Sequence, residues 1–230
     1  MANKYNKINV KNQDLFGKLD IIDKIDKNNQ FTKQEVEILD KLSDDEDEEI
    51  RSRVAELLVF VDSKLAEKIL VRLLDDKDEL VRVNACDSLC NSDSLEVINL
   101  LKNKMLKDKS ALVRGYAALS IADIATKINS DFHELNEFFR YVHSKEKTQW
   151  VKINFYKVLY MLGDNSYLNI LISELNNRLY RNRCAAVHIL SELVSNQNIK
   201  LIKTALTERL KVDTSIAVRS TIQKVINGMD

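Results

Sequence analysis

A pair made of one hydrophobic and one basic residue recurs along the sequence at intervals of about 30 to 40 residues. Its copies are Ile50-Arg51, Val81-Arg82, Val113-Arg114, Val151-Lys152, Tyr180-Arg181 and Val218-Arg219. Repetition at this period is typical of stacked helical hairpins, because a single hairpin cannot bury its apolar face alone, whereas a stack makes a continuous core. The sequence therefore predicts an array of similar units.

The residues around each pair keep the same register. Four positions before the basic residue stands a type that caps helix N-termini: Asp47, Asp78, Ser110, Thr148, Asn177 and Ser215. Apolar residues recur one position before the basic residue and three, four and seven positions after it, which is one face of an α-helix. The fifth unit departs from this pattern, because His188 takes an apolar position. A register on Arg183 would put Leu190 there but would lose the Asn177 cap, so both registers stay open.

A second helical pattern precedes each pair, so each unit is a hairpin. The predicted first helices are 33–42, 64–74, 94–106, 132–142, 167–176 and 199–210. Before them, residues 1–31 are predicted to form a polar leader, a capping helix over 15–25 and a turn at 27–30. The predicted fold is all-α, a right-handed solenoid of about six hairpins that forms one domain over residues 32–230.

The composition fits helices and argues against several classes of protein. The chain has no proline and four glycines, too few for the turns of an all-β protein. Thirty-five basic residues balance thirty-five acidic ones, which disfavours a dedicated nucleic-acid binder. Apolar runs are too short to cross a membrane, no secretory signal is evident, and three cysteines suggest a reducing compartment. We therefore expect a soluble cytoplasmic protein without membrane contact.

The repeat is clearest in three segments, LSDDEDEEIRSRVAELL, LLDDKDELVRVNACDSL and MLKDKSALVRGYAALSI. They resemble HEAT repeats, in particular the short variety also found in phycobilisome lyases, and the resemblance extends over roughly residues 32–228. In such folds the acidic and basic residues of successive turns pair between neighbouring repeats. The resemblance thus implies a structural ladder, made of Asp76, Asp108, Arg51, Arg82 and Arg114. The alternative for the three arginines is an anion site.

No arrangement of residues indicates catalysis. The acidic run 44–49 is interpreted as a solvated turn at a helix N-terminus, with docking of a basic partner as the alternative. Cys86 and Cys90 have the spacing of metal ligands on a helix, but no second ligand pair accompanies them, so they are interpreted as core residues. We expect no catalytic residue, no metal and no cofactor, and hence a protein that is not an enzyme.

A partner is expected on the concave face that second helices usually line in such stacks. Residues two, five and nine positions after the basic residue lie opposite the buried stripe. The residues predicted to bind a partner there are Arg53, Glu56, Phe60, Asn84, Asp87, Tyr116, Asp123, Asn154, Lys157, Met161 and Arg183. Their mixture of charged, polar and large apolar types suits protein recognition better than nucleic acid.

The predicted function is non-enzymatic binding of another protein, as an adaptor or as an immunity protein that neutralises a toxin. Two other functions stay open. One is a HEAT-like DNA-binding protein of the DNA-glycosylase type, and the other is a lyase or chaperone for a cofactor-bearing protein, which the resemblance to short repeats suggests. A homodimer through the C-terminal helix is a further alternative, because no following repeat covers its apolar residues Val218, Ile222, Val225 and Ile226.

Overall fold

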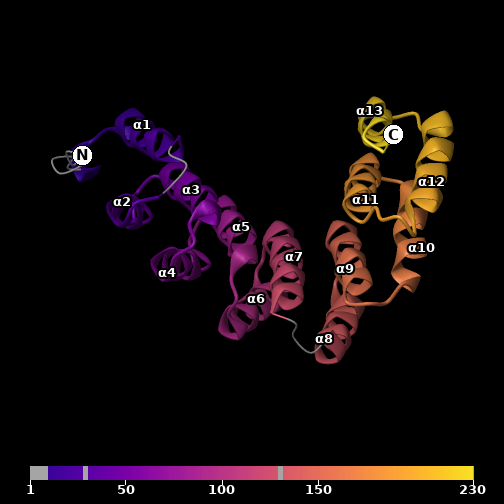
Figure 1. The fold of residues 1–230 in the computed structure, drawn as a ribbon, viewed down its shortest axis with the longest axis horizontal. Helices are drawn as coiled ribbons and strands as arrows, with labels where there is room; N and C mark the ends of the chain where they lie inside the picture. Colours follow the sequence, from indigo (N-terminus) through magenta and orange to yellow (C-terminus); the bar gives the residue numbers. More distant parts are fainter. Residues whose placement is uncertain (1–9, 28–30, 129–131, 230) are drawn as a thin grey trace. The chain divides into compact units, whose positions relative to one another are not determined.

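The computed structural model describes residues 10–27, 31–128 and 132–229, and all regular secondary structure in these ranges is helical (Figure 1). The predicted leader residues 1–9 and turn residues 28–30 lie outside the described residues. A 3₁₀ turn, Val10–Asn12, and helix α1 (Leu15–Asp26) come first. Six helical pairs follow in the described part of the chain: α2 (Lys33–Leu42) with α3 (Glu48–Leu57), α4 (Lys64–Leu73) with α5 (Glu79–Ser88), α6 (Leu95–Lys107) with α7 (Ala111–Lys127), α8 (Phe132–Lys145) with α9 (Gln149–Met161), α10 (Ser166–Ser173) with α11 (Tyr180–Glu192), and α12 (Ile199–Val212) with α13 (Ile216–Asn227). The predicted all-α class is confirmed.

Short polar turns start the second helix of most pairs. The side chains of Asp47, Asp78, Ser110 and Ser215 each accept a hydrogen bond from an amide in the first turn of their helix, as the spacing predicts. Three helices end in a further 3₁₀ turn: Leu58–Phe60 after α3, Leu89–Asn91 after α5 and Glu174–Asn176 after α10.

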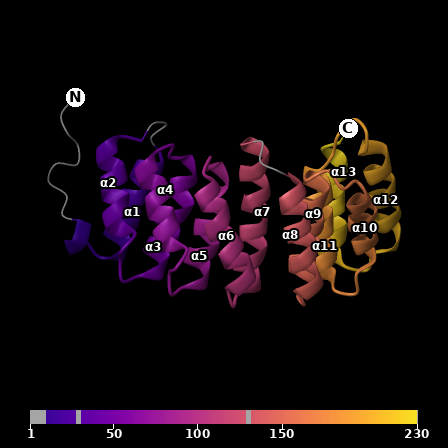
Figure 2. The same cartoon turned by 90° about the horizontal axis from the view of Figure 1, so that it is seen from below.

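The chain divides into two compact units, Met1–Ile128 and Asn129–Asp230. In the first unit, α3, α5 and α7 form one layer and α2, α4 and α6 form the other (Figure 1). Figure 2 shows the axes of α3, α5 and α7 running side by side. Helix α1 packs against α3 and extends that layer. The second unit has the same design, with α9, α11 and α13 as its second helices.

The core repeats from one second helix to the next. Along α5 and the 3₁₀ turn that follows it, Val81 precedes Arg82, and Ala85 and Leu89 come one and two helical turns later. All three are 1% exposed or less. The equivalent residues of α3 and α7 are equally buried, because the same helical face meets the first helices in every pair. This regular burial determines which side of each second helix is exposed to solvent.

Helix α11 follows the register on Arg183 and not the one on Arg181. Ala186, Val187 and Leu190, which stand three, four and seven positions after Arg183, are fully buried. His188 is exposed. The N-cap is Leu179, so the prediction of an Asn177 cap is wrong. Asn177 lies in the preceding turn, where its Oδ1 accepts from the Leu179 amide at 3.0 Å.

Candidate functional site

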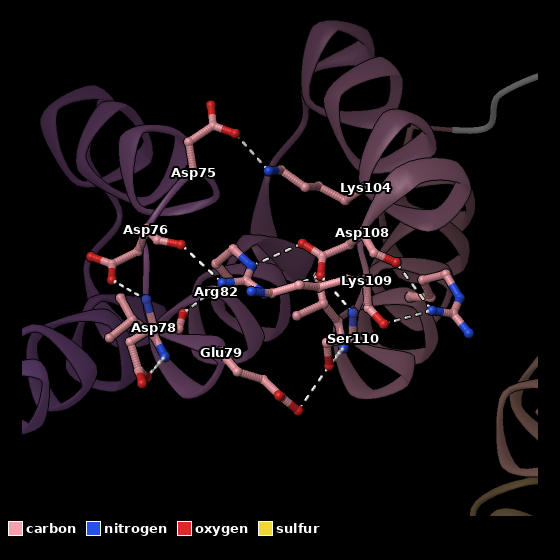
Figure 3. Close-up of polar contacts among 12 residues, drawn as sticks. Asp75, Asp76, Asp78, Glu79, Arg82, Lys104, Asp108, Lys109 and Ser110 are labelled. Atoms are coloured by element: carbon pink, nitrogen blue, oxygen red, sulfur yellow. Dashed lines mark hydrogen bonds and ion pairs between the residues drawn. The ribbon is translucent and has the colours of Figure 1, made fainter.

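Arg82 links the turn of its own helical pair to the turn of the next one (Figure 3). Its Nε and Nη2 donate to the two oxygens of Asp108, at 2.8 and 3.0 Å. Its Nη1 donates to the carbonyls of Asp76, Lys77 and Asp78, at 2.9 to 3.2 Å. Burial alone would raise the pKa of Asp108, but hydrogen bonds from Arg82 and the Ser110 amide outweigh it and hold that pKa below its ordinary value.

The same contact recurs along both units and forms the ladder. Arg51 binds Asp76 at 2.7 Å, and Arg183 binds Asp213 at 2.7 Å. We call each such arginine–aspartate pair a rung of the ladder. The arginine side chains of the three rungs, Arg51, Arg82 and Arg183, are 5% to 8% exposed. Arg114 donates to the carbonyls of Asp108 and Lys109 in its own turn. Because each buried guanidinium of these rungs faces a carboxylate, the three rungs offer no anion site.

Helix α1 closes the first end of the ladder. Asp45 stands six residues before Arg51, as Asp76 stands before Arg82. No ladder arginine precedes Asp45, and its carboxylate pairs instead with Lys18 of α1, at 2.7 Å. Ile21, Ile22 and Ile25 of α1 are buried against the first pair. The helix thus supplies both the apolar cover and the positive charge that a preceding repeat would supply.

Further hydrogen bonds hold the second helices of the first unit to one another. The Ser88 hydroxyl donates to the Ala55 carbonyl, and the Ser120 hydroxyl donates to the Cys86 carbonyl, both at 2.8 Å. The Asn84 amide donates to the Ser52 hydroxyl at 2.9 Å. Together with the ladder, these bonds fix α3, α5 and α7 in register, so their exposed side forms a preorganised surface.

We call this surface the second-helix face. It consists of the exposed and half-buried side chains Glu49, Arg53, Glu56, Phe60, Leu80, Asn84, Asp87, Leu112, Tyr116, Leu119 and Asp123. Leu80 and Leu112 were not among the predicted contact residues, yet they are 56% and 43% exposed. They precede Asn84 and Tyr116 by four residues, which is the helical spacing that could have identified them.

An apolar group occupies the face over α5 and α7. The Ser110 hydroxyl, which caps α7, donates to Glu79 in the first turn of α5 at 2.8 Å. This contact places the first turns of the two helices side by side (Figure 3). Leu80 and Leu112 belong to these turns and are exposed. The half-buried side chains of Tyr116 and Leu119 extend the apolar group along α7.

The surroundings of this apolar group are acidic. Arg53 lies within ion-pair distance of three carboxylates: Glu56 at 2.7 Å, Asp23 at 3.3 Å and Asp26 at 4.0 Å. Burial raises the pKa of the Cys90 thiol, and the nearby carboxylates of Asp123 and Asp87 raise it further. Within the second-helix face, four side chains are acidic and one, Arg53, is basic.

A cavity of about 420 Å³ opens at the end of the face where α3 and α5 terminate. Leu58, Leu70 and Leu89 form its apolar lining, and Phe60, 69% exposed, stands beside it. Lys127 borders the cavity and donates to the Asn91 carbonyl. The hollow is large enough to accept a side chain of a bound partner.

The second unit does not expose its predicted contact residues in the same way. Asn154 is 4% exposed and donates to the Trp150 carbonyl, so it lies inside the unit. The side chain of Lys157 is 14% exposed in an ion pair with Glu192. Met161 is half-buried. Arg183 is 7% exposed, and its prediction as a contact residue is wrong, because it forms a ladder rung.

The C-terminal helix also differs from the expectation. Val218 and Ile222 are fully buried within the second unit, and Val225 and Ile226 are partly buried against the same core, so the apolar surface considered for a dimer is largely covered. The exposed side of α13 carries Arg219, Gln223 and Asn227.

Cys86 and two residues of the acidic run take part in core packing, an ion pair and a helix cap. Burial raises the pKa of the Cys86 thiol to about 12, which suppresses its reactivity. Within the acidic run, Asp44 pairs with Arg72 at 3.3 Å and Asp47 caps α3. In the described ranges, no three histidine, cysteine, aspartate or glutamate residues are grouped so that they could hold a metal ion, and no helix could span a membrane.

The chain is similar to one family model and to solved structures. Residues 36–122 match the family model of HEAT repeats, and no curated protein matches the chain. The fold is similar to that of a chain in the complex of CpcE and CpcF of phycocyanin lyase from Nostoc sp. PCC7120, with a TM-score of 0.58 and 14% identity, covering 100% of this chain and 98% of that one. A designed armadillo repeat protein matches with a TM-score of 0.39 and 19% identity over 96% and 97% of the two chains. Residues 36–122 are thus similar to HEAT repeats, within a fold built from helical pairs.

Proposed function

We propose that the chain binds a partner protein, without catalysis, through the second-helix face of its first unit. The observation that carries this proposal is the apolar group formed by Leu80, Leu112, Tyr116 and Leu119 on two adjoining helices. Protein interfaces are typically centred on such groups and surrounded by polar residues that exclude water.

The ladder supports this proposal because it makes the face rigid before a partner arrives. The second helices are fixed by the Arg51–Asp76 and Arg82–Asp108 pairs, so little conformational entropy remains to be lost on binding. Repeat proteins commonly bind through such surfaces.

The charge of the face favours a partner segment with basic side chains beside its apolar anchors. Glu56, Asp87 and Asp123 are all exposed around the apolar group, and Arg53 is already surrounded by carboxylates. The same charge opposes a nucleic-acid backbone, which would need a positive groove. An adaptor, an immunity protein and a chaperone for a cofactor-bearing protein all need such a protein contact, and the face suits each of them.

Capture of partners from the native cells by the tagged chain tests this function. In the triple variant, Leu80→Ser, Leu112→Ser and Tyr116→Ala are combined. We expect it to capture any stoichiometric partner about tenfold less than the unaltered chain does, because the centre of an interface holds most of the binding energy. The matched control is Leu95→Ser with Leu106→Ser, which changes exposed leucines of α6 in the same unit. A partner that the face variant retains, or that the control loses equally, would refute the proposal. Circular dichroism establishes that both variants are folded.

A further inference from the structure

Four large apolar side chains of the second unit are exposed on two turns. Leu179 and Tyr180 lie at the start of α11, Val212 ends α12 and Ile216 begins α13. Their exposed fractions are 62%, 45%, 67% and 83%. Single exposed apolar residues need no explanation, but four of them gather on two turns that the Arg183–Asp213 pair joins, which is typical of an interaction site. We call these four residues the turn patch.

A buried clamp holds the two turns together beneath the patch. Arg183 donates from Nη1 to the carbonyls of Asn177 and Arg178, at 2.9 and 3.2 Å. From Nε and Nη2 it donates to Asp213, at 2.7 and 2.8 Å. The Asp213 carboxylate also accepts from Arg209 at 2.7 Å. The backbone that carries the turn patch is therefore fixed by charged hydrogen bonds.

The exposed charges on these turns are all positive. Arg178, Arg181 and Lys211 are exposed within residues 177–181 and 211–217. The only carboxylate in those two segments is that of Asp213, which is buried and bound to two arginines. The guanidinium of Arg181 lies 5.9 Å from the centre of the Tyr180 ring. The turn patch is thus an apolar centre whose two turns carry three exposed basic side chains, while Glu208 adds one exposed carboxylate a helical turn before Val212.

We propose that the turn patch is a peripheral docking site for a membrane surface that carries anionic lipids. Its side chains are exposed on turns, and a bilayer interface accepts apolar side chains without a matching shape. Protein interfaces, by contrast, are shape-complementary at their centre. Leu179, Val212 and Ile216 enter the boundary of headgroups and acyl chains, and Tyr180 lies at headgroup level. The three basic side chains attract the anionic headgroups.

This inference is independent of the second-helix face, which lies in the other unit. It also departs from the expectation of no membrane contact, which rested on the shortness of the apolar runs. Peripheral docking needs no such run, since a few side chains on fixed turns and a basic rim give weak, reversible attachment.

Co-sedimentation of the full chain with vesicles tests the proposal. Binding is expected to vesicles of about 30% phosphatidylserine in phosphatidylcholine, and to be at least about fivefold weaker with phosphatidylcholine alone or in 0.5 M salt. The variant Leu179→Ser with Ile216→Ser, and separately Arg178→Gln with Lys211→Gln, should each reduce binding at least about threefold. The matched control is again Leu95→Ser with Leu106→Ser, which should bind like the unaltered chain.

The outcomes separate the classes of ligand. No binding of the unaltered chain to anionic vesicles would overturn the proposal, and so would equal binding by all variants. If the turn-patch variants instead lose a co-purified acidic protein while no vesicle binding occurs, the turn patch is a protein interface and the membrane assignment is wrong.

Discussion

A ladder arginine neutralises a carboxylate, ties two repeats and satisfies turn carbonyls with one side chain. At Arg82 these tasks use separate nitrogens, because the guanidinium offers donors in a fixed fork. A lysine could replace the charge but not the geometry. The fourth pair illustrates the difference: Lys152 stands in the arginine position, and the link to the next pair is made instead by Gln149, whose amide donates to Glu174 at 2.7 Å.

Replacing Arg82 should therefore be costly for the first unit. We expect Arg82→Met to lower its free energy of unfolding by about 3 kcal/mol, because Asp108 would be left buried without its counter-charge. The double variant with Asp108→Asn should recover part of the loss. Arg53→Met removes a half-buried arginine whose carboxylate partners are all exposed to solvent, and it should change the free energy by less than about 1 kcal/mol. Urea unfolding followed by circular dichroism measures these differences, and equal losses for the two arginines would contradict the ladder as a stabilising element.

His143 should make the second unit sensitive to mild acid. Burial lowers its pKa, the positive charge of Lys152 lowers it further, and its Nε2 has no hydrogen-bond partner among the described residues. Since the folded pKa lies below the unfolded one, the unfolded state binds more protons as the pH falls below about 6.5. Stability should be complete above that pH and decline toward pH 5, before the ladder carboxylates protonate.

The measurement for His143 is the urea midpoint as a function of pH. His143→Gln should flatten the decline between about pH 7 and pH 5, because the variant has no proton to take up there. His188→Gln changes an exposed histidine of the same unit and serves as the control. A decline of unchanged depth in the His143 variant would show that another group is responsible.

At the scale of helices, the sequence predicted the repeated burial well and the exceptions poorly. The ladder residues of α3 and α5 follow from a strict register, since the same face is buried in each repeat. Helix α11 was harder to place because Asn177 is a common N-cap residue. In the structure Asn177 instead takes the position of the ladder aspartate, six residues before Arg183, and its carbonyl accepts from Arg183. Asn154 resembled a surface residue by position, but its amide bonds to the Trp150 carbonyl. Such choices depend on which neighbour satisfies a polar group, and periodicity alone does not contain that information.

The register of α11 can be tested by comparing its two arginines. Arg183→Met should shift the unfolding midpoint of the second unit strongly, because it leaves the buried Asp213 with one cation fewer and frees two turn carbonyls. Arg181→Met should leave the midpoint unchanged, because Arg181 is exposed. Chemical denaturation of the two variants side by side gives the answer, and a larger effect of Arg181→Met would restore the other register.

At the scale of the whole molecule, the division into two units predicts separate responses to damage. Each unit has its own core, so a lesion in one should loosen the amides of that unit first. We expect Arg82→Met to accelerate hydrogen exchange in α5 and α7 and to leave α11 and α13 protected, whereas Arg183→Met should do the reverse. Hydrogen exchange read by mass spectrometry resolves these segments. Loosening of all helices by either variant would mean that the chain unfolds as one cooperative body.

The ladder has a consequence for how such a chain can change its length. The second repeat carries one half of a rung at each end: Asp76 accepts from the preceding repeat, and Arg82 donates to the following one. Excising residues 52–82 would join Arg51 to the segment that begins at Val83, and Arg51 would then stand before Asp108 as Arg82 does now. No ladder charge would lose its partner, although surface ion pairs such as that of Asp40 with Arg72 would be removed. Repeats held by such half-rungs can be lost or duplicated as whole modules, so unequal recombination within the gene can lengthen or shorten the protein without first disrupting its fold.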